Sequence, residues 1–196
     1  MTSSSTHARG HATSLPNILT YGRIAAVPAM VACFYLEGHL ANWLALTVFI
    51  AASITDFLDG YLARAWQQQS ALGRMLDPIA DKLLVAAALM MLVDAGTIGG
   101  WSLLAAIIIL SREILVSGLR EFLAELRVSV PVTTLAKWKT TMQMVAIGFL
   151  LAGPAGDAVI PGVSLVGLTL LWLSAILTLY TGWDYFRAGI RHAMEE

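Results

Sequence analysis

The chain has 196 residues, of which 58% are hydrophobic and 13% are charged, and its formal net charge is −1. A soluble domain of average composition carries about a quarter charged residues, so this composition favours a membrane protein. Near-neutral charge without a basic run excludes nucleic-acid binding. The single cysteine, Cys33, excludes both an internal disulfide and a cysteine-based metal site.

The first residues are polar, so we expect 1–13 to be a disordered cytoplasmic tail. A signal peptide could begin in this way, but no small-residue cleavage site follows the first apolar segment, which we therefore expect to be retained. Ser14 as an N-cap and Pro16 in the first turn predict a helix start there. This opening is expected to form a short interfacial helical segment. The membrane domain would then cover 14–190, and 191–196 would form a second cytoplasmic tail.

Apolar segments of about 20 residues are long enough to cross a membrane as helices. Glycines and prolines, such as Gly153-Pro154, mark the connections between such segments. The sequence therefore predicts an all-α integral membrane protein with six transmembrane helices. Their expected ranges are 18–37, 40–62, 77–95, 100–121, 136–154 and 163–186.

The charges are sorted along this map of spans. All 12 lysines and arginines fall on one side, whereas the three opposite loops carry Glu37, Asp94 and Asp157. Cytoplasmic loops are rich in lysine and arginine, so we expect both termini on the cytoplasmic side. A soluble all-helical protein, the alternative, would have no reason to sort its charges in this way.

Four aspartates lie at helical spacing near the predicted cytoplasmic rim: Asp56 and Asp59 on one helix, Asp77 and Asp81 on the next. Carboxylates at membrane depth normally face a partner, a cavity or an ion. Two divalent cations would balance four negative charges, and oxygen-only ligands favour Mg²⁺ or Mn²⁺. Such ions bind phosphates and stabilise displacement at phosphorus.

Neighbouring residues fit a phosphate ligand at these aspartates. Gly60 and Gly73 leave room for close approach, and Arg64 offers a charged fork. Simpler interpretations exist for each pair. Asp77 could be an N-cap with Pro78 at the first helical position, and Asp56 with Asp59 could be a solvated pair. A cation transporter or a purely structural membrane protein are further alternatives, although transporter sites usually lie near the midplane between repeated halves.

Eight residues together carry a resemblance. Their pattern resembles the complete signature of the CDP-alcohol phosphatidyltransferases, and its members are Asp56, Asp59, Gly60, Ala63, Arg64, Gly73, Asp77 and Asp81. The resemblance implies six membrane helices, a homodimer, and transfer of a phosphatidyl group from a CDP-linked lipid to a small alcohol with release of CMP.

The resemblance also implies roles for these residues. Asp56, Asp59 and Asp77 would hold two divalent ions, and Asp81, close to the second ion, would be the general base. The pocket for CDP-diacylglycerol would include Gly60, Ala63, Arg64, Ser70 and Gly73.

Basic residues gather at the predicted cytoplasmic ends of the fourth and fifth spans. Arg112 lies within or at the edge of its span, where a lone arginine is costly unless it meets an anion. Glu113 would offset part of its charge. An acceptor that carries a phosphate is one explanation, and ordinary anchoring of the helices at the membrane boundary is the other.

Residues 111–121, 136–141 and 15–20 with Arg23 resemble the bacterial phosphatidylglycerophosphate synthases, which use sn-glycerol 3-phosphate. The resemblance implies a multi-pass protein of the bacterial inner membrane with a cytoplasmic active site. The phosphate of the acceptor would be bound by Arg112, Arg120, Lys137 and Lys139. The head group of the donor lipid would lie near Asn17, Thr20 and Arg23. Other acceptors remain open: inositol phosphate, serine or phosphatidylglycerol.

Overall fold

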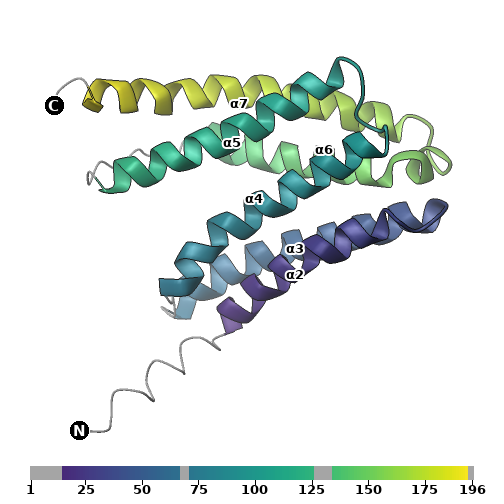
Figure 1. The fold of residues 1–196 in the computed structure, drawn as a ribbon, viewed down its shortest axis with the longest axis horizontal. Helices are drawn as coiled ribbons and strands as arrows, with labels where there is room; N and C mark the ends of the chain where they lie inside the picture. The colour runs from purple at the N-terminus through teal and green to yellow at the C-terminus, as the bar shows by residue number, and fades with distance from the viewer. Residues whose placement is uncertain (1–14, 67–70, 126–133, 194–196) are drawn as a thin grey trace, which may run out of the picture. The chain divides into compact units, whose positions relative to one another are not determined.

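The structure is a computed structural model, and it describes residues 15–66, 71–125 and 134–193. These residues form six α-helices, as the sequence predicts, and include no strand (Figure 1). The helices are α2 (Leu15–Cys33), α3 (His39–Trp66), α4 (Ala71–Asp94), α5 (Ser102–Glu125), α6 (Thr134–Asp157) and α7 (Val163–Ala193). Ser14, the predicted N-cap, and Ser70 lie outside the described residues, whereas Pro16 lies in the first turn of α2 as predicted.

The chain divides into two compact units, of which the N-terminal unit ends at Met91 and the C-terminal unit begins at Leu92. In the N-terminal unit, α2 and α3 pack along one another (Figure 1). Met30 of α2 and Phe49 of α3 are buried in this unit, each at most 2% exposed. Ala45 and Ala52, on the same side of α3 as Phe49, are buried too, and small residues of this kind allow close helix packing.

In the C-terminal unit, α7 packs against both α5 and α6 (Figure 1). Its core includes Ile109 from α5, Ile147 and Leu150 from α6, and Leu171 from α7, all 0% exposed. Gly153 interrupts α6 with φ 43° and ψ −130°, a backbone conformation that a glycine adopts readily, and Pro154 follows it. The predicted break at Gly153-Pro154 is therefore present, although helical turns continue to Asp157.

Large apolar side chains also cover the outside of the helices. Ile54, Met90, Ile114, Leu165 and Ile176 are each more than half exposed. Within the described ranges, two helical segments are long and apolar enough to cross a membrane, Ser102–Ala124 and Val163–Trp183, and the apolar part of α2, Asn17–Cys33, is shorter. Apolar surface on this scale is what lipid-facing helices expose.

The boundaries differ from the predicted ones in two informative places. The first helix ends at Cys33 instead of Glu37, and α4 begins at Ala71, six residues before the predicted Asp77. Pro78 consequently lies inside α4, in its second turn. The interpretation of Asp77 as an N-cap with Pro78 at the first helical position is thus wrong: helical backbone precedes both residues.

Candidate active site

Three polar residues on α2 face the interior of the N-terminal unit. Asn17, Thr20 and Arg23 are spaced by three residues, which places them on one side of the helix, and they are 2%, 1% and 1% exposed. Buried polar side chains need partners. Two of these partners are aspartates of the predicted cluster.

Arg23 and Thr20 contact one carboxylate each. Nη1 of Arg23 lies 2.6 Å from Oδ1 of Asp56 on α3, and Oγ1 of Thr20 donates a hydrogen bond of 2.6 Å to Oδ1 of Asp77 on α4. The two carboxylates come from different helices and meet the same face of α2. The sequence predicts that Thr20 and Arg23 lie near the lipid head group, but it does not predict their contacts with Asp77 and Asp56.

The remaining residues of the signature are placed by their backbone. Asp81 lies one turn after Asp77 on α4 and is partly exposed, whereas Gly73 is buried in the first turns of that helix. Four more signature residues lie on the last turns of α3, but their side chains are outside the described part of the structure. These residues are Asp59, Gly60, Ala63 and Arg64.

The donor chemistry at Asp56, Asp77 and Asp81 fits a hard divalent cation, because every ligand atom is a carboxylate oxygen. Among the side chains that the structure describes, no three acidic, histidine or cysteine residues are grouped closely enough to hold a metal ion. The side chain of Asp59, the fourth predicted ligand, is not among those that the structure describes. The structure therefore describes three of the four predicted ligands, and their binding of a metal stays a prediction.

A second charged cluster lies in the C-terminal unit, where Arg112 and Lys139 contact the same carboxylate. Nη1 of Arg112 is 3.4 Å from Oε1 of Glu113, and Nζ of Lys139 on α6 pairs with that same oxygen. Nη2 of Arg112 also donates to Oγ1 of Thr181 on α7, at 3.2 Å. The side chains of Arg112 and Lys139 are only 11% and 2% exposed.

This cluster contains two of the four predicted acceptor residues. With two cations and one carboxylate, Arg112, Lys139 and Glu113 carry a summed charge of +1, which favours an anion. Arg120 is exposed two turns further along α5, and Lys137 lies near the start of α6 with its side chain outside the described part. The sequence does not single out Thr181, although a threonine in an apolar helix can indicate a polar contact with a neighbouring helix.

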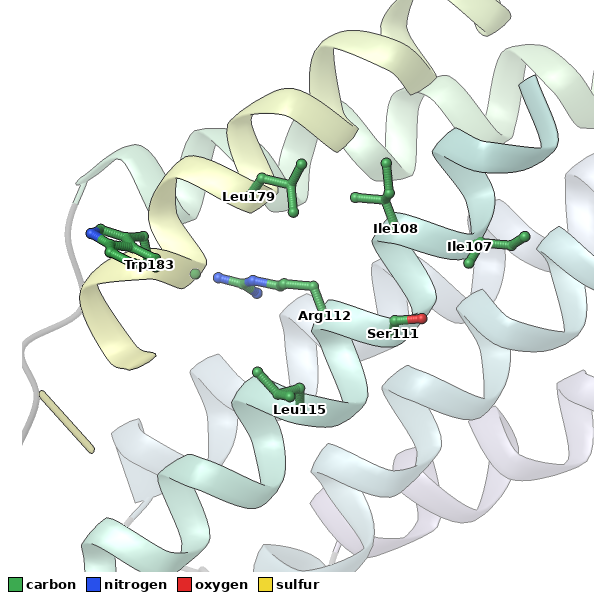
Figure 2. Close-up of a pocket in the computed structure, with 8 residues that line it drawn as sticks. Ile107, Ile108, Ser111, Arg112, Leu115, Leu179 and Trp183 are labelled. Carbon is green, nitrogen blue, oxygen red and sulfur yellow. The ribbon is translucent and has the colours of Figure 1, made fainter. Parts of the chain in front are cut away.

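A groove of about 380 Å³ opens beside Arg112 (Figure 2). The guanidinium group of Arg112 extends from α5 toward α7, between Leu179 and Trp183 (Figure 2). The groove is bordered mainly by apolar side chains, and its lining consists of Ile107, Ile108, Ser111, Arg112, Leu115, Leu179, Gly182 and Trp183. A partly buried cation thus lies beside an apolar surface.

Comparison with known proteins agrees with the signature. The chain is 49% identical to the CDP-diacylglycerol--glycerol-3-phosphate 3-phosphatidyltransferase of Rickettsia bellii, over 89% of this chain and 94% of that protein. It is 43% identical to the protein of the same name from Cereibacter sphaeroides, over 93% and 98% of the two chains. It is also 41% identical to a cardiolipin synthase (CMP-forming) of Oryza sativa subsp. japonica, over 89% of this chain and 56% of that protein.

A sequence profile of one family covers most of the chain. The profile described as CDP-alcohol phosphatidyltransferase matches residues 13–180, which include both charged clusters and every residue of the signature. The chain therefore belongs to the CDP-alcohol phosphatidyltransferase family.

Proposed function

We propose that the protein transfers the phosphatidyl group of CDP-diacylglycerol to sn-glycerol 3-phosphate, which yields phosphatidylglycerol phosphate and CMP. Two relatives that match over most of both chains carry the name of this enzyme. The structural observation that supports the proposal best is the meeting of Asp56 and Asp77, from two helices, on one face of α2. Carboxylates gathered in this way suit a diphosphate donor that arrives with divalent cations.

The reaction exchanges one phosphorus–oxygen bond for another. The hydroxyl oxygen of the acceptor attacks the lipid-side phosphorus, and the bond from that phosphorus to the bridging oxygen breaks, so CMP leaves with that oxygen. Asp81 takes the proton of the attacking hydroxyl. Asp81 on α4 is partly exposed, which is compatible with access to a substrate hydroxyl.

Divalent cations, which this family generally uses, would neutralise the diphosphate and the charge that develops on it. Asp56, Asp59, Asp77 and Asp81 would hold two such ions, either Mg²⁺ or Mn²⁺. Gly60, Ala63, Arg64, Ser70 and Gly73 would contact the donor.

The acceptor phosphate would bind at Arg112 and Lys139, with Arg120 and Lys137 as further contacts. Arg112 and Lys139 contact the same carboxylate, and the charges of these three side chains sum to +1, which would attract an anion. A phosphate matches this charge, whereas a neutral alcohol does not. We further propose that the enzyme is a homodimer in the bacterial inner membrane, with both termini and the active site cytoplasmic.

A second acceptor class has one observation in its favour. The groove beside Arg112 is mainly apolar, which suits an acceptor that carries acyl chains, such as phosphatidylglycerol. The relative from rice is named cardiolipin synthase (CMP-forming), which is a reason to test phosphatidylglycerol as an acceptor, although only 56% of that protein is matched.

The test is a reaction of purified protein with CDP-diacylglycerol and Mg²⁺ or Mn²⁺, in which CMP release is measured with one acceptor at a time. We expect release with sn-glycerol 3-phosphate and little with phosphatidylglycerol, serine or inositol phosphate. Release with phosphatidylglycerol alone would establish the second class. Metal uptake into vesicles without any CMP release would instead indicate a transporter.

A further inference from the structure

One turn of α2 contacts aspartates from two other helices, Asp56 of α3 and Asp77 of α4. Thr20 and Arg23 are three residues apart, so their side chains project from the same face of the helix. One holds Asp77 of α4 and the other holds Asp56 of α3, each at 2.6 Å. The relative position of these two carboxylates thus depends on a third helix, which supplies none of the four aspartates.

Burial separates the supporting side chains from the carboxylates that they hold. The side chain of Arg23 is 0% exposed, whereas that of Asp56 is 46% exposed. Arginine keeps its charge at any accessible pH, and a buried guanidinium without an anion is strongly unfavourable. Arg23 therefore contacts Asp56 from the buried side, while nearly half of the Asp56 side chain stays exposed.

Thr20 and Arg23 each contact only one of the two carboxylate oxygens of their aspartate in these pairs. Thr20 and Arg23 each contact Oδ1 of their aspartate, so Oδ2 of Asp56 and Oδ2 of Asp77 lie outside these two contacts. A carboxylate held at one oxygen keeps a fixed orientation of the other. Groups that hold metal ligands in this way typically change metal affinity by 10–100-fold when they are mutated.

We propose that Thr20 and Arg23 are positioning residues, which hold Asp77 and Asp56 by one oxygen each and so orient the other oxygens toward a divalent cation. The inference rests on the proposed function, because it assumes that the aspartates bind metal. It replaces the expectation that these two residues contact the head group of the donor lipid. The two roles make different predictions when no donor lipid is present.

The experiment measures Mn²⁺ binding to the detergent-solubilised full-length protein without CDP-diacylglycerol, from the electron paramagnetic resonance signal of free Mn²⁺. Thr20→Val removes the hydroxyl and keeps the shape of the side chain. Thr20→Ser is the matched control, because it retains the hydroxyl. We expect Thr20→Val to weaken Mn²⁺ binding about 10-fold or more, and Thr20→Ser to bind nearly as the unmodified protein does.

A second measurement separates positioning from a loss of fold. The unfolding temperature of each variant is compared without Mn²⁺, where a merely structural hydroxyl would have its whole effect. We expect Thr20→Val to lose most of the increase in unfolding temperature that Mn²⁺ gives to the unmodified protein. Arg23→Lys, which keeps the charge and loses the planar fork, is expected to weaken Mn²⁺ binding in the same assay.

The outcomes distinguish this inference from the proposed function. If the unmodified protein binds Mn²⁺ and Thr20→Val binds it equally well, the positioning role is wrong, while the metal-dependent reaction stands. Weaker binding of CDP-diacylglycerol by that variant would then indicate that Thr20 contacts the head group of the donor lipid. If the unmodified protein binds no Mn²⁺ in a saturable way, the metal-dependent reaction fails, and the inference fails with it.

Discussion

Gly167 of α7 lies directly against Leu150 of α6, so that a Cβ atom added to Gly167 would come within 2.8 Å of Cγ of Leu150 and 3.2 Å of its backbone nitrogen. Real Cβ atoms do not approach other heavy atoms to 2.8 Å. Because Leu150 is fully buried, it has no space into which to move. Gly167 therefore sets the distance between the two helices, as small residues do where membrane helices cross.

Gly167→Ala is predicted to destabilise the C-terminal unit. Overpacking of a close contact costs about 1–3 kcal/mol, which exceeds the gain of up to about 1 kcal/mol that alanine gives in a helix. Unfolding in detergent, followed by circular dichroism, measures the change. Gly118→Ala on α5 is the control, since nothing lies within 4 Å of a Cβ at that position. Equal stability of the two variants would contradict a close α6–α7 contact at Gly167.

The sequence predicted the helices well because each contains a long apolar run. It placed their ends less well for the same reason. The start of α4 includes Gly73, Arg74 and Asp77, which a search for apolar residues does not count, although helical backbone hydrogen bonding continues through them. Hydropathy reports where a side chain can be buried, whereas a helix ends where its backbone loses its partners.

The aspartates could be predicted as a candidate site because their spacing alone places them on helix faces. Their partners could not, because Thr20 and Asp77 are 57 residues apart in the chain and meet only through tertiary packing. The signal was nevertheless present: Asn17, Thr20 and Arg23 recur every three residues in an apolar segment. A polar stripe of this kind needs partners inside the protein, and acidic residues on neighbouring helices were available.

Asp81→Asn is predicted to abolish turnover while binding of CDP-diacylglycerol stays nearly normal. The amide keeps the size of the side chain but cannot accept the proton of the acceptor hydroxyl, and loss of a general base typically reduces rate 10²–10⁴-fold. CMP release gives the rate, and retention of labelled CDP-diacylglycerol on the purified protein gives binding.

Asp94→Asn is a suitable control for Asp81→Asn, because Asp94 ends the same helix α4 and belongs to neither charged cluster. It is expected to turn over at the rate of the unmodified protein. Near-normal turnover by Asp81→Asn would remove Asp81 from the role of the base. Loss of both turnover and donor binding would indicate that Asp81 serves mainly to hold metal.

Thr181→Val is predicted to weaken binding of the acceptor and to leave the donor unaffected. The change removes the oxygen that accepts a 3.2 Å hydrogen bond from Nη2 of Arg112, so the guanidinium is held less firmly against α7. A hydrogen bond to a charged group contributes about 1.5 kcal/mol, which corresponds to a rise of about 10-fold in KM for sn-glycerol 3-phosphate.

The matched control is Thr181→Ser, which retains the hydroxyl and should retain the KM of the unmodified protein. Separate titrations of the two substrates measure both KM values. If Thr181→Val raises the KM for CDP-diacylglycerol instead, Arg112 binds the donor lipid and not the acceptor. An equal change in both substrates would assign Thr181 a general role in packing of α7.

Asp157 is predicted to make stability depend on pH at the start of α7. The hydroxyl of Ser164 and the amides of Ser164 and Gly162 donate hydrogen bonds to this carboxylate, with amide distances of 3.0 Å and 3.2 Å, and they lower the pKa of Asp157. A carboxylate whose folded pKa is depressed stabilises the fold above its unfolded pKa, which is about 3.9 for aspartate. That contribution is lost as the pH falls through the lower folded pKa.

The unfolding temperature of the unmodified protein should therefore exceed that of Asp157→Asn by a constant amount from neutral pH down to about pH 5. The difference should shrink as the pH is lowered further, because protonation removes the negative charge that favours the start of α7. Ser164→Ala, which removes the hydroxyl donor and keeps the backbone amide donors, should show a smaller effect in the same direction. A difference that stays constant down to pH 3 would mean that the side chain acts through its shape and not through its charge.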